Sequence, residues 1–197
     1  MKGTISEKVQ QQTVSSQSPE LKYCYKYPHP AVAADCVIFG FDGINIKVLL
    51  IQRGNDPYKG KWAFPGGFMN MDETAEQCAR RELEEETGLS DVTVEQFCTF
   101  SDVNRDPRER VITVAHYALV KLSEVKCGDD AEKAQWFSLN EIPSLAFDHE
   151  LMFKKAIETI KEKIMLKSEE LNKQMDCFNR TEIEVINKII LEKRIKL

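Results

Sequence analysis

Three glutamates within five residues, Glu82, Glu85 and Glu86, are the side chains whose spacing most directly suggests chemistry. At positions i, i+3 and i+4, a helix places all three on one face. Carboxylates held this close repel one another, but around Mg²⁺ or Mn²⁺ they form a hard-oxygen binding site. Such cations would also neutralise a diphosphate that an acidic protein would otherwise repel. The alternative is a solvated, glutamate-rich helix surface, because runs of charge usually face water.

The neighbours of these glutamates suit a binding site. Arg81 and Glu73 could orient the carboxylates from the side. Gly66 and Gly67 carry no side chains, so the backbone can approach a metal or a phosphate closely. The segment therefore predicts a site where metal and phosphate meet.

A loop at residues 101–110 carries the densest group of cationic side chains near this segment. It contains Arg105, Arg108 and Arg110. Guanidinium groups bind phosphate through two hydrogen bonds and can stack on a nucleobase. We therefore expect these arginines to bind substrate. The alternative is a hairpin loop whose Arg and Asp side chains satisfy one another.

Five further side chains are weaker candidates. Arg53, at the end of an expected strand, could touch a phosphate. Tyr58 and Phe68 could stack on a base, although ordinary packing is the more common use of an aromatic side chain. His116 and His149 have no partner at metal-binding spacing, and we interpret both as structural or peripheral.

The hydrophobic pattern predicts a mixed α/β domain at about residues 28–166. Strands are expected at 31–41, 44–53, 62–64, 92–101, 111–121 and 135–137, and Asp42–Gly43 is a turn signal between the first two. Helices are expected at 73–87 and 150–166.

Segments of different composition flank this domain. Residues 1–27 are polar at first and predict a mobile N-terminal tail. Residues 167–197 are strongly charged and predict a helical extension, in which Thr181 and Glu184 fit a capping box. Isoleucines in this extension could form a stripe that packs on the domain or on a second subunit: Ile183, Ile186, Ile190 and Ile195.

Composition limits the class of protein. The chain has 197 residues, 42% of them hydrophobic and 30% charged, which is an ordinary globular balance. A net charge of −5 argues against broad binding to nucleic acid or to anionic membranes. The six cysteines form no CxxC pair and no secretory segment opens the chain, so reduced thiols and a cytoplasmic location are expected.

The segment from Gly67 to Leu89 resembles the Nudix box at every position of that motif, and the likeness extends over about residues 28–164. The resemblance implies an α/β/α sandwich with a mixed sheet. It also implies that Glu82, Glu85, Glu86 and the carbonyl of Gly67 bind divalent metal. Water would then attack one phosphorus of a nucleoside diphosphate linked to another group. Glu85, Glu86 and Arg81 would belong to the catalytic machinery.

In many members of this family the residue that takes the proton from water comes from a loop outside the box. Asp129, Asp130 and Glu132 occupy that region here. We choose Glu132 as the base; the alternative is a solvated acidic turn.

Residues 104–108, together with 145–149, resemble the ADP-ribose pyrophosphatase branch of the family. This likeness implies hydrolysis of ADP-ribose to AMP and ribose 5-phosphate, and a homodimer. One alternative is a Nudix hydrolase that acts on a nucleoside triphosphate. The other is a Nudix-like regulator that senses NAD metabolites, but such regulators carry a winged-helix domain and about 30 residues follow Lys167.

Overall fold

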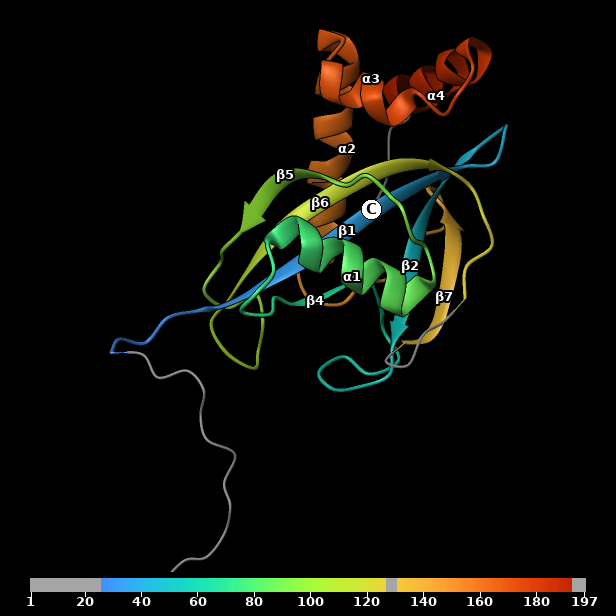
Figure 1. Ribbon diagram of the computed structural model, residues 1–197. Coiled ribbons are helices and arrows are strands. Elements are labelled where there is room, and N and C mark those ends of the chain that lie inside the picture. The colour runs from blue at the N-terminus through green and yellow to red at the C-terminus, as the bar shows by residue number, and fades with distance from the viewer. Residues whose placement is uncertain (1–25, 127–130, 193–197) are drawn as a thin grey trace, which may run out of the picture.

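A mixed sheet lies between helices in the computed structural model, which describes residues 26–126 and 131–192 (Figure 1). The strands are β1 (Ala31–Phe41), β2 (Ile46–Arg53), β3 (Trp62–Ala63), β4 (Gly66–Phe68), β5 (Glu95–Phe100), β6 (Val111–Lys121) and β7 (Ala131–Ser138). The helices are α1 (Ala75–Thr87), α2 (His149–Leu166), α3 (Glu169–Met175) and α4 (Arg180–Glu192).

The sheet has the order β3-β2-β1-β6-β5, with β4 added to β1 and β7 added to β2. Strands β1 and β6 run parallel, and the other pairs are antiparallel. The β1–β2 hairpin turns at Asp42–Gly43 as expected, with Gly43 at φ 97°. Strand β4 pairs with the start of β1, where Asp35 lies opposite Gly66. This pairing brings the glycines next to the box against the first strand.

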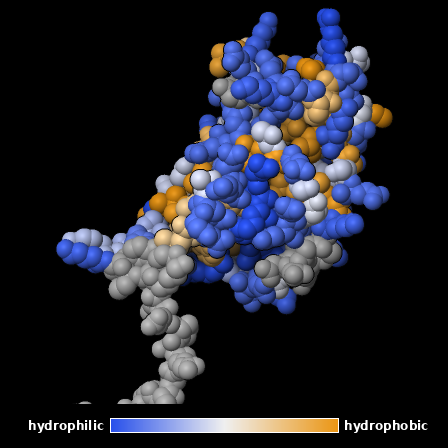
Figure 2. Space-filling model, in the orientation of Figure 1, coloured by the Kyte–Doolittle hydropathy of each residue, from blue (hydrophilic) through white to orange (hydrophobic). Residues whose placement is uncertain are grey.

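Helices cover both faces of the sheet, as the expected α/β/α sandwich requires (Figure 1). Alternate residues of β1 point to opposite faces. Cys36 and Ile38 join Leu83 of α1 in one core, whereas Val37 and Phe39 pack in the core that contains residues of α2. Because both faces are covered, β1 is apolar along almost its whole length. The outer side of α1 remains hydrophilic (Figure 2).

Helix α1 holds the glutamate cluster, and its ends are well defined. Thr74 caps its N-terminus in a reciprocal capping box with Gln77. Gly88 ends it in the left-handed conformation, at φ 73°. The box glutamates therefore lie in the last turns of a helix whose ends are both capped.

The C-terminal helices pack on the sheet. Ile186 and Ile190 of α4 are buried in the same core as α2 and Ile183 packs against it, so this part of the isoleucine stripe packs on the domain; Ile195 lies outside the described residues. Gln174 of α3 accepts a hydrogen bond from the backbone of Leu119 in β6 (3.1 Å). The division of the chain at residue 166 stays a prediction, because this shared core does not mark a boundary there.

In these segments one expectation was wrong and one helix was missed. The cap of α4 lies two residues earlier than expected: Asn179 and Glu182 exchange the hydrogen bonds that we assigned to Thr181 and Glu184. Helix α3 was not predicted, because seven residues give too short a periodic signal.

Two more features bear on the sequence predictions. Cys36, Cys78, Cys98 and Cys177 are free thiols, as expected for the cysteines that the structure describes. Among the described helices, none has the length and apolarity needed to cross a membrane.

Candidate active site

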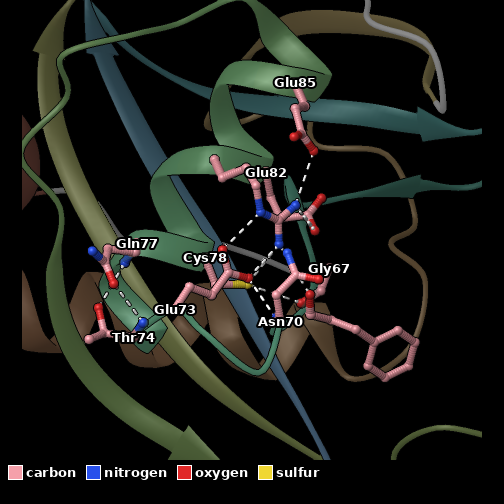
Figure 3. A network of polar contacts seen from close by, with 10 residues as sticks. Gly67, Asn70, Glu73, Thr74, Gln77, Cys78, Glu82 and Glu85 are labelled. Atoms are coloured by element: carbon pink, nitrogen blue, oxygen red, sulfur yellow. Dashed lines mark hydrogen bonds and ion pairs between the residues drawn. The ribbon is translucent and has the colours of Figure 1, made fainter. Parts of the chain in front are cut away.

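Arg81 is at the centre of a hydrogen-bond network within the box segment, residues 67–89. Its guanidinium donates to both oxygens of Glu73 (2.7 and 2.9 Å), to Glu82 (2.7 Å) and to Glu85 (3.0 Å) (Figure 3). Hydrogen bonding from Arg81 lowers the pKa of Glu73 to about 2. The same carboxylates raise the pKa of Arg81, so its charge is permanent. Arg81 therefore holds the carboxylates of Glu73, Glu82 and Glu85 in place.

Glu86 is the buried carboxylate of the cluster, with 9% of its surface exposed. It accepts a hydrogen bond from the backbone N–H of Gly66 (2.9 Å). Burial, helped by the negative charges of Glu82 and Asp35, raises the pKa of Glu86 to about 8 against the opposing effect of that hydrogen bond. Burial also raises the pKa of Glu82. These carboxylates thus share a region where negative charge is poorly compensated.

Gly66 and Gly67 are required by close approach. A Cβ atom on Gly67 would lie 2.3 Å from Oε1 of Glu82, and one on Gly66 would lie 2.5 Å from Oδ1 of Asp35. Any larger residue would displace a carboxylate. The space in front of Gly67 is therefore kept for oxygen ligands and whatever they bind.

The oxygen atoms that line the cleft suit a divalent cation, but one of the predicted ligands does not face the cleft. Glu82, Glu86 and Gly67 line one cleft and supply the hard oxygen donors that Mg²⁺ or Mn²⁺ prefers. Glu85 lies outside that lining; its side chain is 59% exposed and held by Arg81. In residues 26–126 and 131–192, no three His, Cys, Asp or Glu side chains are already grouped as a metal site. The donors that face the cleft are thus two carboxylates and a backbone carbonyl.

The cleft has an outer chamber of about 380 Å³ and an inner chamber of about 100 Å³. The box carboxylates line the outer chamber. Asp35 and His149 are among the residues that line only the inner one. The following residues line both chambers: Arg53, Gly66, Gly67, Phe68 and Arg108.

Two of the predicted arginines stack on aromatic rings at the junction of the chambers. The guanidinium of Arg108 lies 5.0 Å from the ring centre of Phe68 and 5.8 Å from that of Phe147. Arg53 lies 4.9 Å from the ring of Phe147, which also meets Tyr58 edge to face. Phe147 and Tyr58 have φ values of 54° and 64°, a strained conformation for aromatic residues. Arg53, Arg108 and Phe68 therefore lie where the sequence placed them, facing a ligand cleft.

The other two loop arginines are used differently. Arg105 is buried and makes a two-point ion pair with Asp148 (2.6 and 2.9 Å), which fastens its loop to the start of α2. Arg110 donates to the carbonyl oxygens of Ser101 and Asp102 and does not line the cleft. Arg105 also lines the inner chamber, and the expectation that both arginines contact substrate stays a prediction.

Sequence reasoning missed two polar residues of the inner chamber. Asp35 is a carboxylate in the middle of the apolar strand β1, and only 8% of its surface is exposed. His149 is 3% exposed and lines the same chamber, so it is structural but not peripheral. A lone carboxylate within an apolar strand was the signal for Asp35. The side chain of Glu132, in β7, lies outside the described residues, as do Asp129 and Asp130.

Comparison with known proteins agrees with this geometry. The NUDIX domain family matches residues 29–157. The chain is 44% identical over 135 residues to the ADP-ribose pyrophosphatase of Methanocaldococcus jannaschii, covering 68% of this chain and 78% of that protein. It is 33% identical over 170 residues to the ADPR responsive transcriptional repressor NtrR of Acinetobacter baylyi, covering 84% of this chain and 68% of that protein. The NUDIX domain of Shewanella oneidensis NrtR complexed with ADP ribose superposes with a TM-score of 0.66 at 32% identity, covering 71% of this chain and 94% of that one.

Proposed function

This chain belongs to the Nudix family, and from that premise we propose that it hydrolyses ADP-ribose to AMP and ribose 5-phosphate with the help of Mg²⁺ or Mn²⁺. The observation that carries the proposal is one cleft in which Glu82 and Glu86 face Arg53 and Arg108. Carboxylates that hold a cation, opposite guanidinium groups, form a site for a diphosphate. The similarity to an ADP-ribose pyrophosphatase supports ADP-ribose as the nucleotide.

The residues of the cleft divide the work. Arg53 and Arg108 bind phosphate oxygens, and Phe68 offers a ring face for the base. Glu82, Glu86 and the carbonyl of Gly67 would hold the cation, with Glu85 completing the set if it turns from Arg81. A bound divalent cation neutralises the diphosphate and makes its phosphorus more open to attack by water. Arg81 keeps the carboxylates in place.

Glu132 is our choice for the group that accepts the proton from the attacking water. The choice rests on its place in the chain, beside the β2–β7 pair that leads to Arg53. A positioned general base accounts for a rate factor of about 10² to 10⁴. Glu132→Gln should therefore lower kcat at least about tenfold with little change in KM, measured by AMP release. An unchanged kcat removes Glu132 from the mechanism.

The direct test is a substrate panel with Mg²⁺: ADP-ribose, NADH, diadenosine polyphosphates and nucleoside triphosphates, with products separated by chromatography. We expect AMP from ADP-ribose, abolished by a chelator and restored by added Mg²⁺ or Mn²⁺. Preferential cleavage of another panel member would keep the Nudix chemistry and overturn the choice of ADP-ribose. A nucleoside triphosphate would be the foremost of these.

A second candidate, a sensor that binds ADP-ribose without cleaving it, is favoured by one observation. The similarity to the repressor spans 170 residues, against 135 for the pyrophosphatase. The two functions separate in one experiment, because a sensor binds ADP-ribose tightly in calorimetry while no AMP accumulates. We favour the enzyme because the box carboxylates are all present and two of them face the cleft.

We also propose a cytoplasmic homodimer that binds neither nucleic acid nor membrane. The net charge of −5 offers no broad cationic surface for either polymer or lipid. Light scattering at micromolar concentration should give twice the mass of the chain, and a monomeric mass would contradict the dimer.

A further inference from the structure

The inner chamber contains one hydrogen-bond donor and one acceptor that the protein leaves unused. Nε2 of His149 and Oδ1 of Asp35 lie 3.8 Å apart, too far for a hydrogen bond to each other. Neither atom has another hydrogen-bond partner among the described residues. Both residues line the chamber, and both are more than nine-tenths buried. Both residues line the open space of the chamber, so a ligand bound there can pair with these two atoms.

The protonation of His149 follows from its other nitrogen. The backbone N–H of Phe64 donates to Nδ1 of His149 (3.0 Å), so Nδ1 carries no proton. Burial lowers the pKa of His149, which keeps the ring neutral near pH 7. A neutral ring with a bare Nδ1 must carry its proton on Nε2. His149 therefore presents a donor to the chamber and cannot act there as a base.

Asp35 presents an acceptor. The hydroxyl of Thr113 donates to its Oδ2 (2.6 Å), which fixes the carboxylate. The nearest guanidinium nitrogen of Arg105 is 4.0 Å away and is occupied by Asp148. Oδ1 remains free, with space kept open because residue 66 has no side chain. An ionised phosphate oxygen has no proton to donate to Oδ1, so it does not satisfy this acceptor, although Arg53, Arg105 and Arg108 also line the chamber.

A hydroxyl group fits both atoms, because its oxygen accepts one hydrogen bond while its proton is donated in another. We propose that the inner chamber binds the base-free sugar of the substrate, with one sugar hydroxyl bridging Nε2 of His149 and Oδ1 of Asp35. Phe64 stacks on His149, and Phe147 closes the wall, so apolar surface meets the carbon atoms of the sugar. This proposal rests on the proposed function and adds a determinant of substrate choice.

The position of the base-stacking candidates selects between the two sugars of ADP-ribose. Phe68 and Arg108 line both chambers at their junction, so a base that stacks there keeps its own sugar at the junction and leaves the inner chamber to the other sugar. The sugar without a base is thus the one assigned to the inner chamber, and the nucleoside stays outside.

The test compares ADP-ribose with an alkyl ester of ADP, which keeps the diphosphate but lacks the second sugar. His149→Asn is the key variant, since the Asn oxygen can accept from the N–H of Phe64 while the donor at Nε2 is lost. We expect kcat/KM for ADP-ribose to fall about 10- to 100-fold and that for the ester to stay within about twofold of wild type. Asp35→Asn should have the same effect. Its amide N–H group would take the place of Oδ1 and could not accept the hydrogen bond of the sugar hydroxyl.

The control is His116→Asn. His116 is a second buried histidine, 2% exposed, in the neighbouring strand β6 and outside the chamber lining. It should leave the ratio of kcat/KM for the two substrates at the wild-type value. Equal losses on both substrates in His149→Asn would indicate a purely structural role and overturn the proposal. So would a wild-type protein that does not prefer ADP-ribose to the ester.

Two further arms keep the outcomes separate. ADP-ribose lacking a hydroxyl on the base-free sugar should lose affinity in wild type but not further in His149→Asn. If only the analogue lacking a nucleoside hydroxyl behaves so, the assignment to the base-free sugar is wrong. If wild type cleaves nothing, the proposed function fails, and the ratio of Kd values for ADP-ribose and the ester still decides the inner chamber by the same criteria.

Discussion

Glu86→Gln should lower kcat for ADP-ribose on the order of 10²- to 10³-fold while the fold stays intact. Glu86 faces the cleft beside Glu82, and its charge would help to hold a divalent cation there. Such a cation is worth several kcal/mol in the transition state, and each factor of ten in rate corresponds to about 1.4 kcal/mol. Gln has the same shape and can still accept the N–H of Gly66, so what is lost is mainly the charge. Single-turnover measurement of AMP release gives the rate.

The same substitution should leave thermal stability unchanged or increased. In the absence of metal, Glu86 is a buried carboxylate near two others, and burial raises its pKa. Replacing it with a neutral side chain relieves that repulsion. Glu84→Gln is the matched control, because Glu84 is exposed on the same helix and outside the cleft. Equal rates in both variants would contradict a role for Glu86 at the site.

Local patterns predicted most of the fold. Strands β1 and β6 begin and end where the apolar runs do, because both are covered on both faces and are therefore mostly apolar. Helix α1 ends at Thr87, where the sequence predicted, and Gly88 caps it. Strand β4 escaped prediction because its three residues are defined by pairing with β1. Short elements formed by distant contacts carry no period of their own.

The site divides in the same way. Glu82, Glu86 and Gly67 could be found from the sequence, since one helix and the short strand before it bring them together. The inner chamber could not, because Asp35 and His149 meet across more than a hundred residues of chain. Contacts between distant segments create that meeting: Phe64 binds His149, and Gly66, two residues on, pairs with Asp35.

The arginines of residues 101–110 show that the sequence does not reveal which partner a charged side chain will bind. Arg105 and Arg108 look equivalent in the printed chain, three positions apart in one loop. The structure pairs the first with Asp148 and the second with Asp106, and the second also lies over the ring of Phe68 at the cleft. The internal ion pairs considered for the loop are therefore present, and substrate binding by Arg108 stays a prediction.

Arg105→Ala should destabilise the protein by about 3–5 kcal/mol, the usual cost of removing one partner from a buried ion pair. The side chain of Arg105 is 5% exposed and that of Asp148 is 18% exposed, so the carboxylate left behind is poorly solvated. For a domain of this size, Tm should fall by roughly 6–20 °C. Because the pair joins the loop to the first turn of α2, the loss should show in urea unfolding as well as on heating. Asp148→Ala should cost a similar amount, and the double variant much less than the sum, as a double-mutant cycle would measure.

Arg108→Ala is the contrasting change in the same loop. Its side chain is 40% exposed and stacks on Phe68 at the cleft, so KM for ADP-ribose should rise about tenfold or more with a smaller loss of stability. Arg105→Ala, assayed well below its lowered Tm, should keep a KM within a few-fold of wild type, because its guanidinium is engaged by Asp148. A raised KM with an unchanged free energy of unfolding would reverse the assignment and make Arg105 a substrate ligand. The two variants thus distinguish a loss of substrate binding from a loss of stability in one loop.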